Sequence, residues 1–496
     1  MKIKKEYIFL ILIFLLTLSI RLYYAFQTPY FDVEAYSIIR EVDHIQKAVT
    51  PLFKDDLSYG GRNLIFPPYY YYVIFFFKII LGSLTFKLVP NIFASLLVFV
   101  VYMLSFNITK DYKASLFTSL ISGFIPIFFY ETINNISVYT LIVPLTFFTL
   151  FCFIKISENK KYVIYFITSL ALLRLSHPSA ILLVLVLLLY LLIVRLEGLR
   201  YSREELELIL FSTFIMVWSL FIVFKKPLLV HGPYVIWQNI PAQVLYRYFS
   251  EFNILEAIYN IGIVPFVFGI YIIYNFTLRK KDKKTYLLVS FAILMLILLW
   301  LKLIQLKIGL MFLSVILTIL FAIFFCLFFS YLEKTKFYKF KPLVYILLFF
   351  LIIITSFLPS ITSAKKSIVE SVNSNEIRAL EWIKSNTEQD DVILSTVEEG
   401  YLITSIAERK NVADPNFLLI EDAEQRVKDI EQMYVTIFET EAIDLLNKYR
   451  INYIYFSDRA KKQFGIQEIK YIDETCFELV YDNKIKIYKS LCIMEE

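Results

Sequence analysis

Two carboxylates follow the first long apolar stretch of the chain. Asp32 and Glu34 lie in the run Phe-Asp-Val-Glu-Ala-Tyr, and apolar residues then recur at helical spacing, at Ala35, Ile38, Ile39, Val42 and Ile45. This pattern predicts an amphipathic helix on a membrane surface, with both acids in its first turn. One interpretation is that Asp32 caps this helix and Glu34 complements its dipole. The other is that a carboxylate at the lipid boundary binds a metal ion or takes a proton from an acceptor.

A third acid, Glu131, lies with Asn134 and Asn135 in a short turn between two apolar runs. Turns need polar residues in any case. However, short outer turns of one helix bundle converge near the same membrane surface, so we expect Glu131 to lie close to Asp32. Hard divalent cations such as Mg²⁺ or Mn²⁺ take oxygen ligands from several loops, which makes Asp32 and Glu131 candidate metal ligands.

Cationic side chains define two further candidate sites. Lys302 and Lys307 interrupt the apolar run from Tyr286 to Tyr331. They either extend to the outer headgroups or neutralise a lipid-linked phosphate. The segment 225–256 carries His231, Arg247 and Glu251, which suit contact with a lipid phosphate through Arg247 and with an acceptor or metal through the other two. The chain has no glycine-rich phosphate loop, no G-x-S-x-G and no paired H-x-x-H.

The elements that position these residues are membrane helices. Of the 496 residues 58% are hydrophobic, and the mean hydropathy is +0.64, so the bilayer must be the solvent of most of the chain. The net charge of +6 is spread in short clusters between apolar runs, which is topology information and gives no indication of nucleic-acid binding. We predict spans at 7–26, 86–106, 114–130, 137–154, 162–175, 179–194, 206–224, 257–276, 286–301, 308–331 and 342–358.

Loop charge decides the orientation of these eleven spans. With the N-terminus in the cytoplasm, every dense Lys and Arg cluster falls on the cytoplasmic side, as the positive-inside rule requires. A further crossing at Pro67 to Leu84 would reverse this, so we interpret that tyrosine-rich segment as a helix in the outer interface. The C-terminal region is then extracytoplasmic.

The sequence therefore predicts an α-helical polytopic membrane domain at 1–360, with an outer loop at 27–85, and a soluble α/β domain at 361–496. Within the soluble domain we expect helices at 376–385, 401–407 and 441–449, strands at 392–395 and 453–456, and a hairpin at 477–488 turning at Asp482 and Asn483. That turn places Cys476 opposite Lys489, which argues against a disulfide between Cys476 and Cys492.

The ordered features resemble those of the GT-C membrane glycosyltransferases. They are a first helix followed by the acidic motif at 31–36, a G-x-x-x-x-x-P-P-x-Y-Y element at 61–71, an acid on the next outer loop, two short helices around Arg174 and His177, and an outer soluble domain. The segments 379–387, 391–395, 400–404 and 409–414 look like the part of the oligosaccharyltransferase catalytic subunit that carries its acceptor-reading W-W-D-Y-G motif. This chain reads Thr-Val-Glu-Glu-Gly there, at 396–400, and offers Glu131 where that family has D-x-D.

The resemblance implies transfer of a sugar or glycan from a polyprenyl- or dolichyl-phosphate-linked donor to a glycan, lipid or protein acceptor on the outer face of the cell membrane. Asp32 would be the catalytic carboxylate, assisted by Glu34 and Glu131, while Lys302 or Lys307 would hold the donor phosphate. Two alternatives stay open, a non-catalytic glycan-binding relative and a lipid-glycan transporter or flippase. A transporter would need charges along a path through the bilayer, whereas the charges here gather at the outer ends of the spans.

Overall fold

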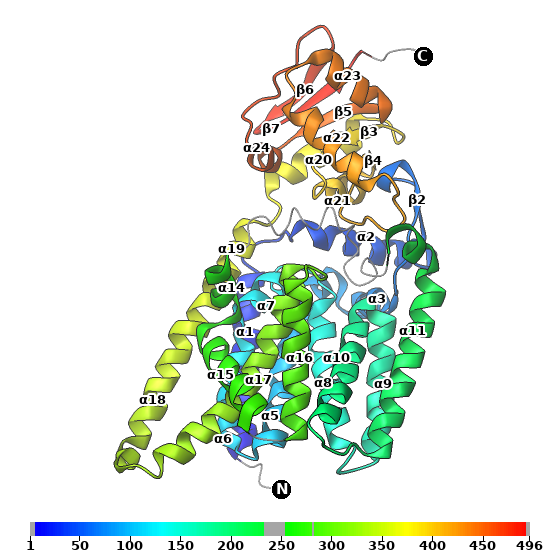
Figure 1. The fold of residues 1–496 in the computed structure, drawn as a ribbon. Coiled ribbons are helices and arrows are strands. Elements are labelled where there is room, and N and C mark those ends of the chain that lie inside the picture. The colour runs from blue at the N-terminus through cyan, green and yellow to red at the C-terminus, as the bar shows by residue number, and fades with distance from the viewer. Residues whose placement is uncertain (1–4, 233–252, 280–281, 493–496) are drawn as a thin grey trace.

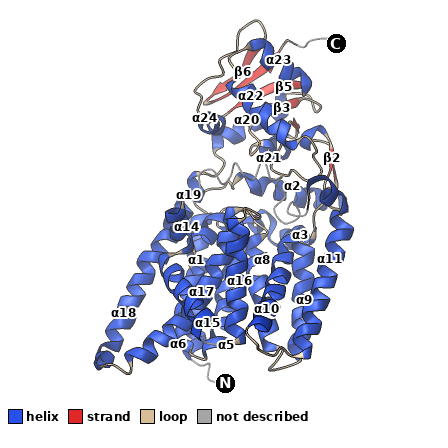
Figure 2. Cartoon of the chain, in the orientation of Figure 1, coloured by secondary structure: helices blue, strands red, loops and turns tan. Residues whose placement is uncertain are grey.

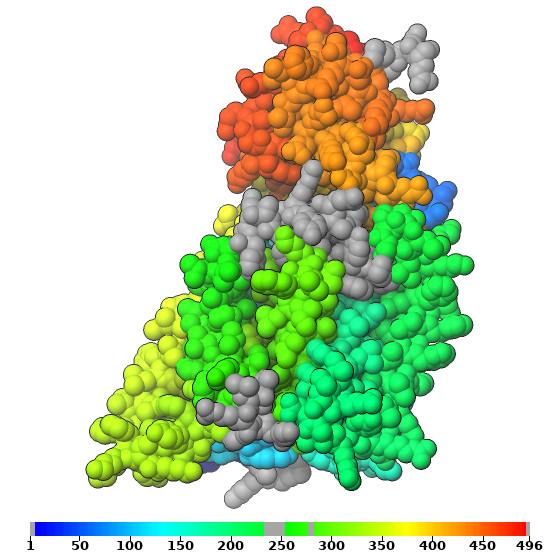
Figure 3. Space-filling model, in the orientation of Figure 1, coloured from blue at the N-terminus to red at the C-terminus, as the bar shows by residue number. Residues whose placement is uncertain are grey.

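The structure, a computed structural model, describes residues 5–232, 253–279 and 282–492. A bundle of long helices occupies one half of the molecule, and the C-terminal domain stands at one end of it (Figure 1). Figure 2 shows that strands belong almost entirely to this domain, and Figure 3 shows it as a lobe of its own. The predicted fold class, a polytopic helical domain followed by a small α/β domain, is confirmed.

Each predicted span coincides with a helix or a run of helices. The helices of the bundle are α1 (Lys5–Ala25), α4 (Thr85–Ser95), α5 (Leu97–Thr109), α6 (Tyr112–Gly123), α7 (Pro126–Thr132), α8 (Tyr139–Lys155), α9 (Lys161–Ser176), α10 (Ile181–Leu196), α11 (Arg203–His231), α14 (Ile254–Ile261), α15 (Ile263–Arg279), α16 (Lys283–Trp300), α17 (Leu306–Leu332), α18 (Lys341–Ile352) and α19 (Leu358–Val369). Within the described ranges, seven helices or unbroken runs of adjoining helices are long and apolar enough to cross a bilayer, or up to nine if two bent pairs count as one span each. The count of eleven crossings stays a prediction.

Helix α17 forms the centre of the bundle. It contacts α5, α6, α7, α14, α15 and α16, and nearly every side chain from Ile308 to Ile323 is buried. A helix that is apolar on all sides is expected where neighbours surround it. The residues at its first turn are consequently held in a fixed position relative to the rest of the bundle.

Two shorter helices form a layer between the bundle and the C-terminal domain. Helix α2 (Val33–Ala48) packs on α3 (Tyr69–Leu81), and Figure 1 shows both at the end of the bundle that faces the domain. One face of α2 packs through Ala35 and Val42 on the membrane half. Its other face packs through Val33 and Tyr36 on the C-terminal domain. Helix α3 has 13 residues and so a length of about 20 Å, too short to cross a hydrocarbon core of about 30 Å.

The loop between α2 and α3 is joined to the C-terminal domain by hydrogen bonds. It contains β1 (Lys54–Asp55), the 3-10 turn η1 (Ser58–Gly60) and β2 (Arg62–Asn63). Tyr59 donates its hydroxyl to the Asp414 carbonyl at 2.6 Å, and its backbone N–H to Asn411 Oδ1 at 2.7 Å. Arg62 donates to the backbone carbonyls of Asn416 and Leu418. The loop therefore holds the domain at a second place besides α2.

The C-terminal domain contains a five-stranded sheet in the order β4-β3-β5-β7-β6. Its strands are β3 (Val392–Leu394), β4 (Lys410–Asn411), β5 (Ile451–Phe456), β6 (Phe477–Asn483) and β7 (Ile485–Ser490), and its helices are α20 (Ser374–Asn386), α21 (Gly400–Leu402), α22 (Ala423–Val435), α23 (Glu439–Lys448) and α24 (Asp458–Phe464). Strands β3, β4 and β5 are parallel, and β7 joins β5 and β6 antiparallel. The predicted strands and helices overlap these elements, although β3 and α23 end one residue earlier than predicted. The helix predicted at 401–407 begins as α21 and continues as a π-helical turn, η6 (Ile403–Ala407), whereas β4, α22 and α24 were not predicted.

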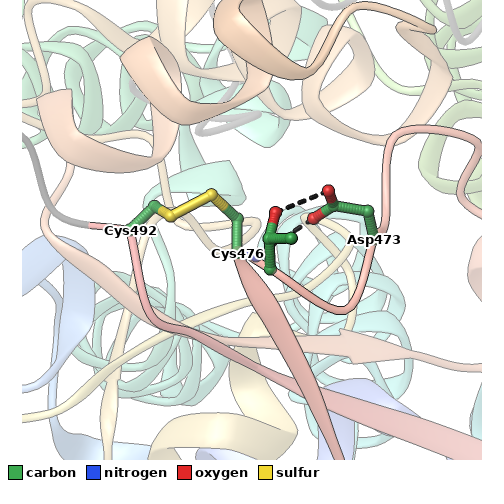
Figure 4. Close-up of a disulfide and its surroundings, with 4 residues drawn as sticks. Asp473, Cys476 and Cys492 are labelled. Atoms are coloured by element: carbon green, nitrogen blue, oxygen red, sulfur yellow. Dashed lines mark hydrogen bonds between the residues drawn. A yellow bond between two sulfur atoms is a disulfide. The ribbon is translucent and has the colours of Figure 1, made fainter.

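The sequence argument against a disulfide is wrong. Cys476 and Cys492 are bonded, with their Cα atoms 4.9 Å apart (Figure 4). The hairpin turns at Lys484, whose φ is +62°, one residue later than expected, and its register shifts again between Leu479 and Tyr481. Cys476 therefore lies opposite Leu491, whose N–H donates to the Cys476 carbonyl at 2.9 Å. Disulfides persist in oxidising compartments, which agrees with the predicted extracytoplasmic position of this domain.

We expect this disulfide to be present in the isolated protein. Under denaturing conditions without reductant, a maleimide reagent should label only Cys152 and Cys326, and after reduction all four cysteines. Because the bond closes a loop of 16 residues, its removal in Cys476→Ser should lower the free energy of unfolding of the domain by about 3 kcal/mol. Four labelled cysteines before reduction would contradict the pairing, and Cys326→Ser is the control that loses one label without unfolding the domain.

Candidate functional site

Three acids and one lysine from three helices meet at the end of the bundle that faces the C-terminal domain. The Lys307 ammonium, in the first turn of α17, lies 2.7 Å from Glu34 Oε1 and 3.4 Å from Glu131 Oε2. Glu34 comes from the first turn of α2 and Glu131 from the last turn of α7. About half of the Glu34 side chain and a third of the Lys307 side chain are accessible, whereas Glu131 is largely covered. We call Asp32, Glu34, Glu131 and Lys307 the acid cluster.

Asp32 is the N-cap of α2 and is hydrogen-bonded to the loop that follows Glu131. Its carboxylate accepts from the Val33 N–H at 2.7 Å, and its own N–H donates to the Asn134 carbonyl at 3.1 Å. Burial and the neighbouring Glu34 raise the pKa of Asp32 to about 6, against the opposing effect of Lys307. The ammonium of Lys307 instead lowers the pKa of Glu34. Glu34 is therefore ionised at neutral pH, while Asp32 is poised to exchange a proton.

A buried network positions the loops that carry these acids. The Lys87 ammonium, at the start of α4, donates to the Tyr30 carbonyl at 2.8 Å and to Asn134 Oδ1. Asn91, one turn further along α4, accepts from Arg21 Nε at 3.0 Å and donates to the Ile133 carbonyl at 3.1 Å. These contacts tie α1 and α4 to the segments before Asp32 and after Glu131. Lys87 and Arg21 were not singled out by the sequence reasoning.

The C-terminal domain reaches the same region through Arg459. Its guanidinium donates to Glu376 Oε1 at 2.7 Å and to the Glu370 carbonyl at 2.8 Å, and its charge acts on Asp32. The Val372 N–H donates to the Phe31 carbonyl at 3.0 Å, directly before Asp32. The domain thus contributes a positive charge close to the acid cluster and fixes the backbone on its N-terminal side.

An aromatic group lies on the bundle side of the cluster. Tyr139, at the start of α8, is within electrostatic range of Lys307 and Glu34, and its ring centroid is 5.3 Å from that of His177. His177 Nδ1 accepts from the Ser179 N–H at 3.1 Å in the break between α9 and α10. This bond gives His177 a structural role at the break between the two helices. Tyr139 was missed because one tyrosine in an apolar run gives no distinctive signal.

The other predicted site residues are not shown to join the cluster. Lys302 lies in the tight turn between α16 and α17, with φ of +54°. His231 ends α11, and the charges that act on it are those of Glu421 and Arg62. The segment carrying Arg247 and Glu251 lies outside the described residues.

The cluster fits a fixed ammonium better than the expected metal ion. Lys307 lies between Glu34 and Glu131 at salt-bridge distances, in the place where a bridging cation would bind. Among the described residues, the carboxylates of Asp32, Glu34 and Glu131 do not form a close group of three ligand atoms. The one group that does, Glu439, Asp473 and Cys476, includes a cysteine held in the disulfide. We therefore derive no step through a metal ion.

The segment 396–400 is folded into the domain. Glu399 is fully buried and accepts from the hydroxyls of Thr396, at 2.8 Å, and Ser457; burial raises its pKa to about 7. Gly400 lies so close to the segment that follows β4 that a Cβ atom would be 2.1 Å from the Ala413 carbonyl oxygen. Glu398 is the exposed residue of the segment.

Comparison with known proteins places the fold. A family model described as "Dpy19: Q-cell neuroblast polarisation" matches residues 284–473, and no curated protein sequence matches the chain. Among solved structures, the archaeal oligosaccharyltransferase AglB from Archaeoglobus fulgidus, in complex with an inhibitory peptide and a dolichol-phosphate, has a TM-score of 0.70 at 14% identity, covering 90% of this chain and 69% of that chain. The A. fulgidus enzyme in complex with Zn and sulfate gives 0.69 at 14% identity, covering 94% and 71%.

A second relative has a length close to that of this chain. ArnT from Cupriavidus metallidurans, bound to undecaprenyl phosphate, has a TM-score of 0.56 at 10% identity and covers 96% of this chain and 97% of that chain. Identities this low establish the fold alone. The chain has the fold of the GT-C membrane glycosyltransferases, as its sequence motifs predicted.

Proposed function

We propose that this protein is a membrane glycosyltransferase that moves a sugar from a polyprenyl-phosphate-linked donor to an acceptor at the acid cluster. The observation that carries the proposal is the juxtaposition of Asp32, poised near neutral pH, with an accessible ammonium held by two carboxylates. The fold supports it, because similar structures hold dolichol-phosphate and undecaprenyl phosphate.

The chemistry needs a base and a positive charge on opposite sides of the sugar. The acceptor nucleophile forms a bond to the anomeric carbon as the bond from that carbon to the phosphate oxygen breaks. Asp32 takes the proton of the nucleophile, and the electron pair leaves with the lipid phosphate. Lys307 neutralises the charge that develops on that phosphate. Direct displacement of this kind inverts the anomeric carbon.

Glu34 and Glu131 hold Lys307 rather than react. Paired to one ammonium from two different helices, they restrict where its charge can lie. An incoming phosphate then exchanges with Glu34, the more accessible of the two partners, while Glu131 keeps its contact. Arg459 lies beyond Asp32 and favours its ionised form.

The distribution of buried charge favours surface chemistry over transport. Buried Arg21 and Lys87 lie in the network beside Asp32, buried Arg174 lies near the end of α9, and buried Glu205 lies near the start of α11. In the described part of the bundle, these buried charges do not form a path from one end to the other, which a carrier of charged lipid would need. Movement of a fluorescent lipid-linked sugar from one leaflet to the other in vesicles containing the protein would instead support a flippase.

Replacement of Asp32 by Asn should abolish transfer. Loss of a general base lowers the rate by about 10²- to 10⁴-fold. In the unmodified protein, the rate should rise with pH up to about 6 and then level, because the carboxylate must be ionised to accept a proton. Glycan profiling of producing cells and a pH profile in membranes measure the two effects.

The matched control is Asp43→Asn, which removes an acid of the same helix that pairs with Lys78. Its glycans should equal those of the unmodified protein. Unchanged glycans in the Asp32→Asn cells, at equal protein level, would dismiss Asp32 as the base.

Replacement of Lys307 by Gln should weaken binding of a lipid phosphate. Because a charged hydrogen bond contributes about 1.5–3 kcal/mol, the affinity for undecaprenyl phosphate should fall at least tenfold, as measured by native mass spectrometry. Lys54→Gln removes an exposed lysine of the outer loop and should leave the affinity unchanged. Equal affinity of the Lys307→Gln and unmodified proteins would contradict binding of the lipid phosphate by Lys307.

Transfer should persist when divalent cations are chelated. Lys307 already supplies the positive charge between Glu34 and Glu131, so the proposed step has no need of an ion there. EDTA added to membranes should change the rate less than twofold. Loss of activity in EDTA, restored by Mg²⁺ or Mn²⁺, would instead support the metal ligands expected from the sequence, Asp32 and Glu131.

A further inference from the structure

A cleft lies between α1, α5 and α8 at the end of the bundle away from the C-terminal domain. Its volume is about 450 Å³, and most of its wall is apolar, formed by Leu10, Ile11, Phe99, Met103, Phe106 and Phe151. Figure 1 shows α5 and the N-terminus at this end, opposite α2. The cleft is therefore separate from the acid cluster, and the proposed function does not use it.

One polar group in the cleft lacks a partner. Asn107 lines it, is only 3% exposed, and has an amide nitrogen without a hydrogen bond among the described residues. Its orientation is fixed, because Asn107 Oδ1 accepts from the Lys284 ammonium at 2.9 Å and an ammonium only donates. The two N–H groups must then point away from Lys284. A buried donor without an acceptor is costly, so we expect a ligand oxygen there.

Two lysines line the same cleft. Lys110 caps the C-terminal end of α5 and is exposed, and Lys155 ends α8 and pairs with Glu158. Glu158 also pairs with Lys284, so this one acid faces two ammonium groups, and Lys110 adds a further positive charge. The apolar walls suit an acyl chain, and the buried N–H donor suits a phosphate or ester oxygen. The excess of positive charge suits an anionic headgroup.

We propose that this cleft binds one anionic phospholipid of the surrounding membrane. Its acyl chain lies along α1 and α5, an oxygen of its glycerol phosphate accepts from Asn107, and its headgroup charge lies between Lys110 and Lys155.

The test compares two lipids with the same acyl chains. Purified full-length protein in detergent is titrated with phosphatidylglycerol or phosphatidylcholine, and bound lipid is counted by native mass spectrometry. We expect one phosphatidylglycerol to bind several-fold more tightly than phosphatidylcholine. Lys110→Asn should lower the phosphatidylglycerol affinity about fivefold, and Asn suits the left-handed conformation of this position, where φ is +57°. Asn107→Asp keeps the acceptor for Lys284 but loses the N–H donor, and should lower the phosphatidylglycerol affinity further.

Lys113→Gln is the matched control. Lys113 lies three residues from Lys110, but over the rings of Tyr112 and Tyr345 rather than in the cleft. Its replacement should leave the affinity unchanged. Equal binding of the two lipids, or equal effects at Lys110 and Lys113, would overturn the proposal and indicate general adsorption. Displacement of phosphatidylglycerol by an equimolar amount of undecaprenyl phosphate would also overturn it, since the cleft would then belong to the donor lipid.

Discussion

One ammonium group determines the arrangement of the candidate site. Lys307 stands at the partly accessible start of α17, a helix whose next 16 residues are all buried. Glu34 and Glu131 compensate it from two helices that are far apart in the sequence. The position of α17 therefore fixes the start of α2 and the end of α7 together. Removing either acid leaves the lysine short of a partner and loosens the helix that carried it.

The layer formed by α2 transmits this constraint to the C-terminal domain. Val33 and Tyr36, within one turn of Asp32, pack among residues of the domain, while Ala35 and Val42 pack on the bundle. Tyr59 and Arg62 bind the domain again at Asp414 and Asn416. Two separate attachments hold a body against rotation better than one. The domain consequently stays over the acid cluster, where Arg459 acts on Asp32.

The sequence drew attention to the four charged residues of the acid cluster, and their catalytic and binding roles stay predictions. Lys307 interrupts an apolar run, where a charge needs an explanation, and convergence of short outer turns led us to expect Glu131 close to Asp32. The salt bridges of Lys307 to Glu34 and Glu131 were not predicted. Tyr139 gave no such signal, and Lys87 was hidden because its partners are the Tyr30 carbonyl and an asparagine rather than an acid. The predicted register of the hairpin was wrong for a local reason. A lysine at positive φ, Lys484, forms the turn that Asp482 and Asn483 were expected to form.

The segment at 396–400 serves the packing of the C-terminal domain. Gly400 is held by the approach of the 411–414 backbone, which leaves no room for a side chain. Glu399 is turned inward to Thr396 and Ser457, so it has no surface to offer a ligand. Only Glu398 faces outward. Toward the acid cluster, the domain contributes the fixed position of the backbone before Asp32 and the charge of Arg459.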